Sequence, residues 1–251
     1  MYSASFAQDI ICALRAAESD RALVDLVASV AHDMGFRHYA LIHHDDLGQA
    51  RPDRVDLKMY PSAIVERLID GRGYRWDPII RSCLFSGGAF LWSEIDRIIR
   101  LDRRDREAFA AGVREGLNEG ITVPYVRLGE CTGSCTFAGA ARPEHASKYL
   151  GIAQMVGVFA FQSALRLVGQ APRPVEARPH LHPRPRDCVI LAGRGYSNKE
   201  IARALALAPR TVDGYLTEAR RLFDAHDRTE LVVSAVLAGE IETYELRRQP
   251  G

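Results

Sequence analysis

Hydrophobic and polar positions follow two distinct periods along the first two-thirds of the chain. Between residues 20 and 34, apolar residues recur four, three and four positions apart, which predicts a helix that ends at Gly35. Alternation over 55–60 predicts a strand. The other expected elements are helices over 5–18, 61–69, 77–81, 102–117 and 143–168, and extended segments over 36–42, 90–94, 120–126 and 133–139. Strands grouped between helices predict an α+β fold, an α-β-α sandwich with one antiparallel sheet.

The stretch 197–223 has the pattern of two helices joined by a tight turn. Ser197 and Glu200 form a capping box for the first helix, and Pro209 suits the first position of the second. The apolar stripe of the second helix is Val212, Leu216 and Ala219. This outline predicts a helix-turn-helix, whose second helix enters the DNA major groove, with an ordinary helical hairpin as the alternative.

A Pro-rich, polar segment separates these two parts of the chain. We therefore expect a first domain of residues 1–168, an extended linker of 169–180, and a small all-α four-helix domain of 181–251. The formal net charge is only +1. Whole-chain charge thus gives no sign of nucleic-acid binding, and any basic surface must be local.

Several kinds of chemistry are not expected. Cys131 and Cys135 have no second ligand pair for zinc, and a polar loop explains His43–Asp46 more simply than a metal site. No nucleophile-base-acid set or phosphate-binding Gly-rich loop is visible, so we expect no enzyme, catalytic residue or cofactor. Scattered cysteines, no signal peptide and no segment near the roughly 20 apolar residues of a membrane span predict a cytoplasmic protein that does not bind membranes.

Five groups of residues around the helical hairpin have a distinctive spacing. They are Gly195, Glu200-Ile201-Ala202, Thr211-Val212, Leu216 and Arg228-Thr229. This spacing resembles the DNA-binding domain of the LuxR family of transcription regulators. The residues then expected to contact double-stranded DNA are Lys199, Arg210, Thr211, Gly214, Thr217 and Arg221. Pro185, Asp213 and Leu222-Phe223 depart from the family pattern, and a carboxylate at position 213 would repel phosphate.

A second set of residues, in the first domain, is similar to the acyl-homoserine-lactone-binding domain of the same family. The set is Tyr60-Pro61, Asp77-Pro78, Trp92-Ser93 and Gly120-Ile121-Thr122-Val123-Pro124. The resemblance implies that Asp77 accepts the amide N–H of a small-molecule signal and that Tyr60 donates to its acyl carbonyl. It also implies that Trp92 packs against the ring of the signal and that Thr136 helps to bind the acyl carbonyl. Alternatively, Asp77 only caps a helix, and Tyr60 and Trp92 belong to the core.

Two positions in the pocket depart from the resemblance. Ile64 stands where the family has a Trp that donates to the lactone carbonyl, and Leu68 stands where it has a second Tyr. The two positions are one helical turn apart and predict an apolar wall. The signal is then an unusual lactone, another small molecule, or absent altogether. Trp76 is a candidate replacement donor, with a structural or surface role as the alternative.

The sequence as a whole predicts a quorum-sensing type, ligand-responsive transcription regulator that binds a two-fold-symmetric promoter site as a homodimer. RNA polymerase is a further candidate partner. The alternative is a ligand-independent or antagonistic regulator, or one that senses a non-lactone molecule. The expected long helix offers a face for pairing of two protomers, although this face could equally pack on its own sheet. That face comprises Ile152, Val156, Phe159 and Ser163.

Overall fold

The computed structural model describes residues 4–44, 51–126, 133–170 and 179–247. The described residues form two compact units, one up to residue 170 and one from residue 179. The first unit contains a five-stranded antiparallel sheet with strand order β2-β1-β5-β4-β3. Its strands are β1 Phe36–His43, β2 Asp56–Met59, β3 Phe90–Leu91, β4 Gly120–Tyr125 and β5 Gly133–Ala140.

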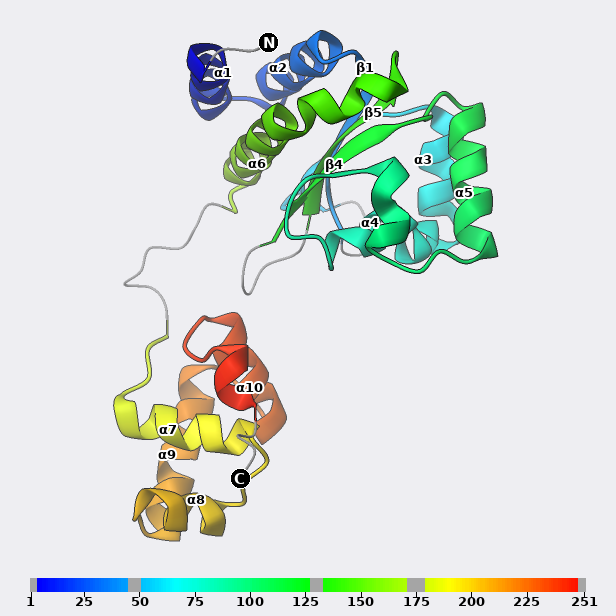
Figure 1. Cartoon of the computed structure of the whole chain (residues 1–251). Helices are drawn as coiled ribbons and strands as arrows, with labels where there is room; N and C mark the ends of the chain where they lie inside the picture. The colour runs from blue at the N-terminus through cyan, green and yellow to red at the C-terminus, as the bar shows by residue number, and fades with distance from the viewer. Residues whose placement is uncertain (1–3, 45–50, 127–132, 171–178, 248–251) are drawn as a thin grey trace. The chain divides into compact units, whose positions relative to one another are not determined.

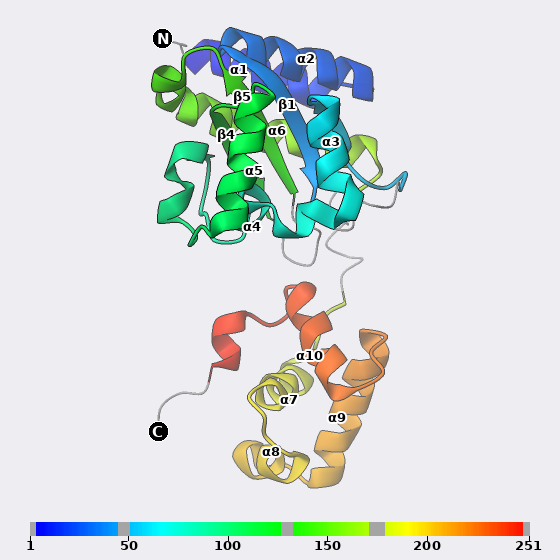
Figure 2. The same ribbon diagram turned by 90° about the vertical axis from the view of Figure 1, so that its right-hand side faces the viewer.

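Helices cover both faces of this sheet (Figures 1 and 2). One face carries α1 Ala4–Ala16, α2 Asp20–Asp33 and α6 Leu150–Leu167, and the other carries α3 Ser62–Ile69, α4 Pro78–Cys83 and α5 Arg103–Arg114. The 3₁₀ helices are η1 Asp70–Trp76, η2 Trp92–Arg97 and η3 Pro143–Tyr149. This arrangement confirms the predicted α-β-α sandwich.

Two local predictions need correction, and one element was not predicted. The expected extended segment 90–94 is a strand only over Phe90–Leu91, and η2 follows at once, anchored where Ser93 N–H donates to Glu119. The expected helix over 143–168 begins as a 3₁₀ helix rather than as an α-helix. The 3₁₀ helix η1 was not predicted, because its Gly-containing sequence has no apolar period.

Side chains on β4 and β5 alternate between the two layers, although β5 is buried along its whole length. Cys135 and Phe137 belong to the large core beneath α1, α2 and α6. Ser134 and Thr136 therefore point to the opposite face, toward α3, α4 and α5. Thr122 of β4 is the direct cross-strand partner of Thr136. Hydroxyl groups thus lie in the middle of an otherwise apolar layer.

The helical run Pro143–Leu167 is long and apolar enough to cross a membrane by length and composition alone. In the fold, however, Val156 is fully buried and Ile152 and Ser163 are also buried within the core of the first unit. Phe159 packs partly buried against the same core. The face suggested for protomer pairing therefore packs on its own domain.

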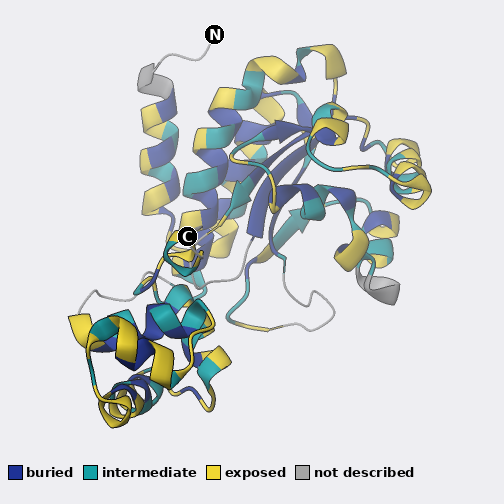
Figure 3. Ribbon diagram, turned by 60° about the horizontal axis from the view of Figure 1, so that its bottom comes forward, coloured by how far each residue is buried: buried dark blue, intermediate teal, exposed yellow. Residues whose placement is uncertain are grey.

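The second unit is all-helical and has its own core. Its elements are α7 Pro183–Gly193, α8 Asn198–Leu205, α9 Pro209–Leu222, α10 Arg228–Leu237 and the 3₁₀ helix η5 Thr243–Leu246. The predicted capping box of Ser197 and Glu200 starts α8, and Pro209 occupies the first turn of α9. The stripe of Val212, Leu216 and Ala219 is buried. Figure 3 shows this separation of dark-blue inner faces from yellow outer faces in both units.

Candidate functional site

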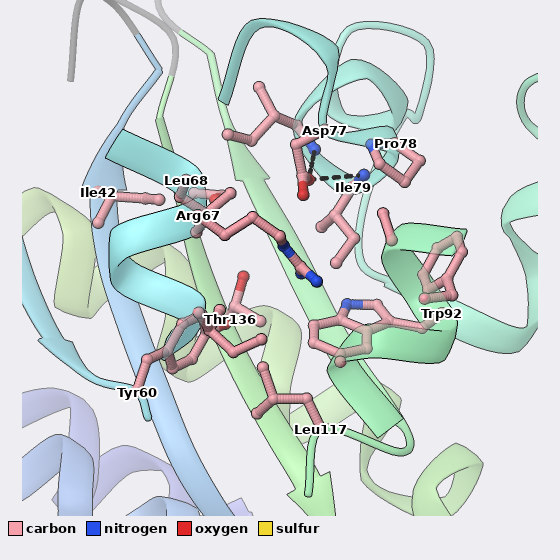
Figure 4. A pocket seen from close by; sticks show the side chains of 16 residues that line it. Ile42, Tyr60, Arg67, Leu68, Asp77, Pro78, Ile79, Trp92, Leu117 and Thr136 are labelled. Atoms are coloured by element: carbon pink, nitrogen blue, oxygen red, sulfur yellow. Dashed lines mark hydrogen bonds between the residues drawn. The ribbon is translucent and has the colours of Figure 1, made fainter. Parts of the chain in front are cut away.

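A pocket lies between the sheet and the layer of α3, α4 and α5 (Figure 4). It encloses about 620 Å³ of empty space, part of which is open to solvent. Its lining residues are Ile42, Tyr60, Ile64, Arg67, Leu68, Asp77, Pro78, Ile79, Ile80, Trp92, Ala108, Phe109, Gly112, Leu117, Ser134 and Thr136. All six side chains expected to bind a ligand are among them. Mostly apolar walls with a few convergent polar groups are the usual form of a small-molecule site.

Asp77 caps α4 and also lines the pocket. Its Oδ1 accepts the backbone N–H groups of Ile79 at 2.9 Å and Ile80 at 3.0 Å. Burial raises the pKa of Asp77, against the opposing effects of these two N–H groups and of the Arg67 guanidinium. Both cap bonds fall on one oxygen, so the cap and ligand roles considered for Asp77 are compatible: Oδ2 stays available as an acceptor.

A chain of polar side chains runs from Trp92 across two strands. The Trp92 indole N–H donates to Thr122 Oγ1 at 2.9 Å, and Thr122 Oγ1 lies 3.0 Å from Thr136 Oγ1. Burial and then the charge of Asp77 raise the pKa of the Tyr60 phenol, whereas a hydrogen bond with Thr136 lowers it. The Tyr60 phenol is therefore neutral and can donate. Because the indole N–H of Trp92 is engaged in the fold, only its ring can contact a ligand.

The α3 wall of the pocket is apolar except at one residue. Ile64, Arg67 and Leu68 fall at positions i, i+3 and i+4 and so share one helix face. Ile64 is buried and Leu68 partly buried, and both belong to the apolar cluster beside Trp92. Arg67 extends from this face into the middle of the pocket (Figure 4). The wall predicted to be apolar therefore also carries a cation.

Arg67 and Thr122 were not predicted as site residues, although the sequence contains a feature that points to each. Arg67 lies three positions after Ile64 and therefore falls on the same helix face, and Thr122 is a polar residue in a buried strand. Trp76, considered as a replacement donor, does not line the pocket: it is 58% exposed, and the Arg104 guanidinium lies 5.8 Å from its ring centre. Its surface role is the one that the structure supports.

The histidines considered as metal ligands serve the fold. His43 Nδ1 accepts the N–H of Val55 at 2.8 Å, and His44 Nε2 lies 2.8 Å from Ser134 Oγ. Burial, and to a smaller extent His43, lowers the pKa of His44 to about 4. Of the other residues considered for metal binding, Cys135 is buried in β5, and Asp45, Asp46 and Cys131 lie outside the described residues. Within the described part of the chain, no three metal-binding side chains cluster.

The second candidate surface is the face of α9 opposite its buried stripe. Its exposed residues include Arg210, Thr211, Asp213, Gly214 and Arg221, with Thr217 partly buried and Lys199 exposed on α8. Asp213 does not simply project into solvent, because the Asn198 amide donates to its Oδ1 at 3.3 Å. Arg228 in turn donates to Asn198 Oδ1 at 3.0 Å. Asn198 of α8 thus links Asp213 of α9 to Arg228 of α10.

A substitution at Gly214 can show whether this face of α9 contributes to folding or to DNA binding. A Cβ built at Gly214 meets nothing within 4 Å, so Gly214→Ala should stabilise the unit by about 0.5–1 kcal/mol through helix propensity. If α9 approaches DNA closely at this position, the added methyl group should nevertheless weaken DNA binding. Thermal unfolding and DNA titration of the same variant separate the two effects. Tighter or unchanged DNA binding would remove Gly214 from the contact surface.

Comparisons with known proteins match both parts of the chain to described families. Residues 19–164 match the family described as "Autoinducer binding domain", and residues 180–235 match "Bacterial regulatory proteins, luxR family". The transcriptional activator AhyR of Aeromonas hydrophila is 24% identical over 88% of this chain and 86% of its own length. The quorum sensing-dependent transcriptional regulator RpaR of Rhodopseudomonas palustris is 27% identical over 88% of both chains.

Two solved structures share the fold. The crystal structure of Escherichia coli SdiA matches 94% of this chain and 98% of its own with a TM-score of 0.59 and 16% identity. SdiA in complex with octanoyl-rac-glycerol matches 95% of this chain and 97% of its own with a TM-score of 0.61 and 18% identity.

Proposed function

This chain belongs to the LuxR family of bacterial regulatory proteins that carry an autoinducer-binding domain, and we propose that a small acylated molecule bound in the first unit controls DNA binding by the second. In this proposal residues 1–168 bind the signal, residues 169–180 link the units, and residues 181–251 bind DNA. Two protomers together read a two-fold-symmetric site, as helix-turn-helix dimers do.

The observation that carries the ligand proposal is the position of Asp77. One carboxylate oxygen holds α4, and the same residue lines an apolar pocket in which Tyr60 and Thr136 provide hydroxyl groups. A buried ligand amide needs an acceptor for its N–H and a donor for its carbonyl, because an unmet polar group costs about 1–3 kcal/mol. Asp77 supplies the acceptor and Tyr60 the donor.

The DNA proposal rests on the shape and charge of α9. The helix buries one stripe, begins after a tight turn at Ala206, and exposes Arg210 and Thr211 in its first turn. Residues near the start of a recognition helix contact base edges. Arg221, near the other end, is placed to contact phosphate. Asp213 accepts a hydrogen bond from Asn198, but its carboxylate keeps the negative charge that would repel phosphate.

A ligand-independent regulator is the second candidate, and Arg67 is the observation that favours it. A side chain that crosses the pocket, together with aliphatic residues at positions 64 and 68, could replace a ligand in stabilising the first unit. Soluble chain should then accumulate without added signal, and organic extracts of it should contain no small molecule. A signal recovered from the extract would reject this candidate.

Ile64→Trp should raise the response to straight-chain acyl-homoserine lactones by about 3-fold to 10-fold, the value of one added neutral hydrogen bond. Ile64 lies on the pocket wall, so an indole there can supply the missing donor to a lactone carbonyl. The measurement is a reporter dose-response over several chain lengths, with Ile64→Phe as the control that adds a ring without a donor. A wild type that already responds at nanomolar dose would contradict the role given to this position.

A further inference from the structure

Arg67 is a charged side chain in an otherwise apolar wall. It lies on the same face of α3 as Ile64 and Leu68, and its guanidinium reaches the middle of the pocket (Figure 4). An arginine on the outer face of this eight-residue helix would keep its hydration. An arginine that faces the pocket loses part of its hydration, and this loss costs free energy. Its inward position therefore needs a partner that offsets this cost.

The described residues offset this cost only in part. None of them accepts a hydrogen bond from the Arg67 side chain or approaches it closely enough for an ion pair, whereas Arg81 on α4 pairs with Asp105 at 2.9 Å. Asp77 is near enough for its pKa to be lowered by Arg67, but its Oδ1 is held by α4. Toward the described residues, the planar guanidinium thus keeps hydrogen-bond donors available. Its N–H groups fit a carboxylate through two parallel hydrogen bonds.

We propose that the ligand is an N-acyl amino acid with a free carboxylate, such as the ring-opened form of an acyl-homoserine lactone. This inference rests on the proposed function and specifies its signal. The amide N–H binds Asp77, the carboxylate binds Arg67, and the acyl chain lies along the apolar lining. Amide and carboxylate are attached to the same carbon in such a molecule, which matches two opposite charges that interact within one pocket.

The neutral lactone suits this pocket less well. Its carbonyl would meet Ile64 in place of an indole, and the Trp92 N–H is already bonded to Thr122. Arginine could also donate to a lactone carbonyl, but this acceptor is neutral and forms a weaker hydrogen bond with a guanidinium than a carboxylate does. The wall is therefore arranged to distinguish an acid from its lactone.

The test is calorimetric titration of the full chain at neutral pH with two probes, N-octanoyl-L-homoserine and N-octanoyl-L-homoserine lactone. The acid should bind about 10-fold to 100-fold more tightly to wild type, the effect of a charge-assisted pair. Arg67→Gln should remove this preference, and Arg67→Lys should retain part of it. Arg106→Gln, an exposed position on α5 outside the lining, is the matched control and should leave the preference unchanged.

The outcomes separate this inference from the proposed function. Preferential binding of the lactone, or an acid preference that survives Arg67→Gln, overturns the inference and leaves ligand-controlled DNA binding intact. If neither probe binds, the inference is overturned, and DNA titration with and without cell extract then decides the proposed function independently. Thermal unfolding of Arg67→Gln and Arg67→Leu shows whether a lost preference reflects a lost fold.

Discussion

Asp77→Asn is expected to weaken binding of the signal by about 1–3 kcal/mol, roughly 5-fold to 150-fold, while the first unit stays folded. The substitution keeps Oδ1, which accepts the N–H groups of Ile79 and Ile80, and asparagine caps helices as well as aspartate does. It replaces the second oxygen by an NH₂ group, which would face the ligand N–H donor to donor. The measurement is the half-maximal dose in a reporter assay together with direct titration of the purified chain.

Two further variants provide the comparisons needed to interpret the effect of Asp77→Asn. Asp102→Asn changes another helix-capping aspartate in the same unit, away from the pocket lining, and should not affect ligand binding. Asp77→Ala removes cap and acceptor together and should also lower the free energy of unfolding by about 1 kcal/mol. If Asp77→Asn and Asp102→Asn show the same half-maximal dose as wild type, Asp77 is only a helix cap.

Arg210→Ala and Arg221→Ala are expected to impair DNA binding in different ways. Loss of a base contact at Arg210 should cost about 1–3 kcal/mol at the preferred site and reduce discrimination between sites. Loss of a phosphate contact at Arg221 should weaken all sites about equally and reduce the slope of log K against log salt by about one. Both side chains are exposed, so neither change should unfold the unit.

Titration of each variant against specific and random DNA, at several salt concentrations, distinguishes the two effects. Arg247→Ala removes the same charge from an exposed position after η5 in the same unit and serves as the control. Wild-type affinity and salt slope in both variants would reject the orientation assigned to α9. An identical pattern in both would show that Arg210 contacts phosphate rather than bases.

Periodicity was sufficient to predict most of the fold. Neighbouring residues determine several local features of the fold. These features are the stripe with Val27 on α2, the stripe with Leu216 on α9, the cap at Ser197 and the first-turn proline Pro209. The sandwich also followed, because strands grouped between helices have few compact arrangements. Irregular segments such as η1 and η2 lack a period, and their conformation depends on contacts far along the chain.

The site was less predictable than the fold. Its aspartate, tyrosine and aliphatic positions came from family spacing, but the partner of the Trp92 N–H depended on the register of β4 and β5, which places Thr122 opposite Thr136. Arg67 would ordinarily be taken for a solvent-exposed helix residue, because charged residues are mostly exposed. Only the packing of α3 against the sheet shows that it turns inward.

In the proposed function, a small molecule in the Asp77 pocket changes the affinity of the chain for DNA. The most direct measurement is a DNA titration of full chain purified from its native host, before and after organic extraction and again after return of the extracted molecule, identified by mass spectrometry. Extraction should change the affinity, the returned molecule should restore it, and Asp77→Asn should need a higher dose of that molecule. An affinity that is the same in all three states, with no small molecule in the extract, would contradict the proposed function.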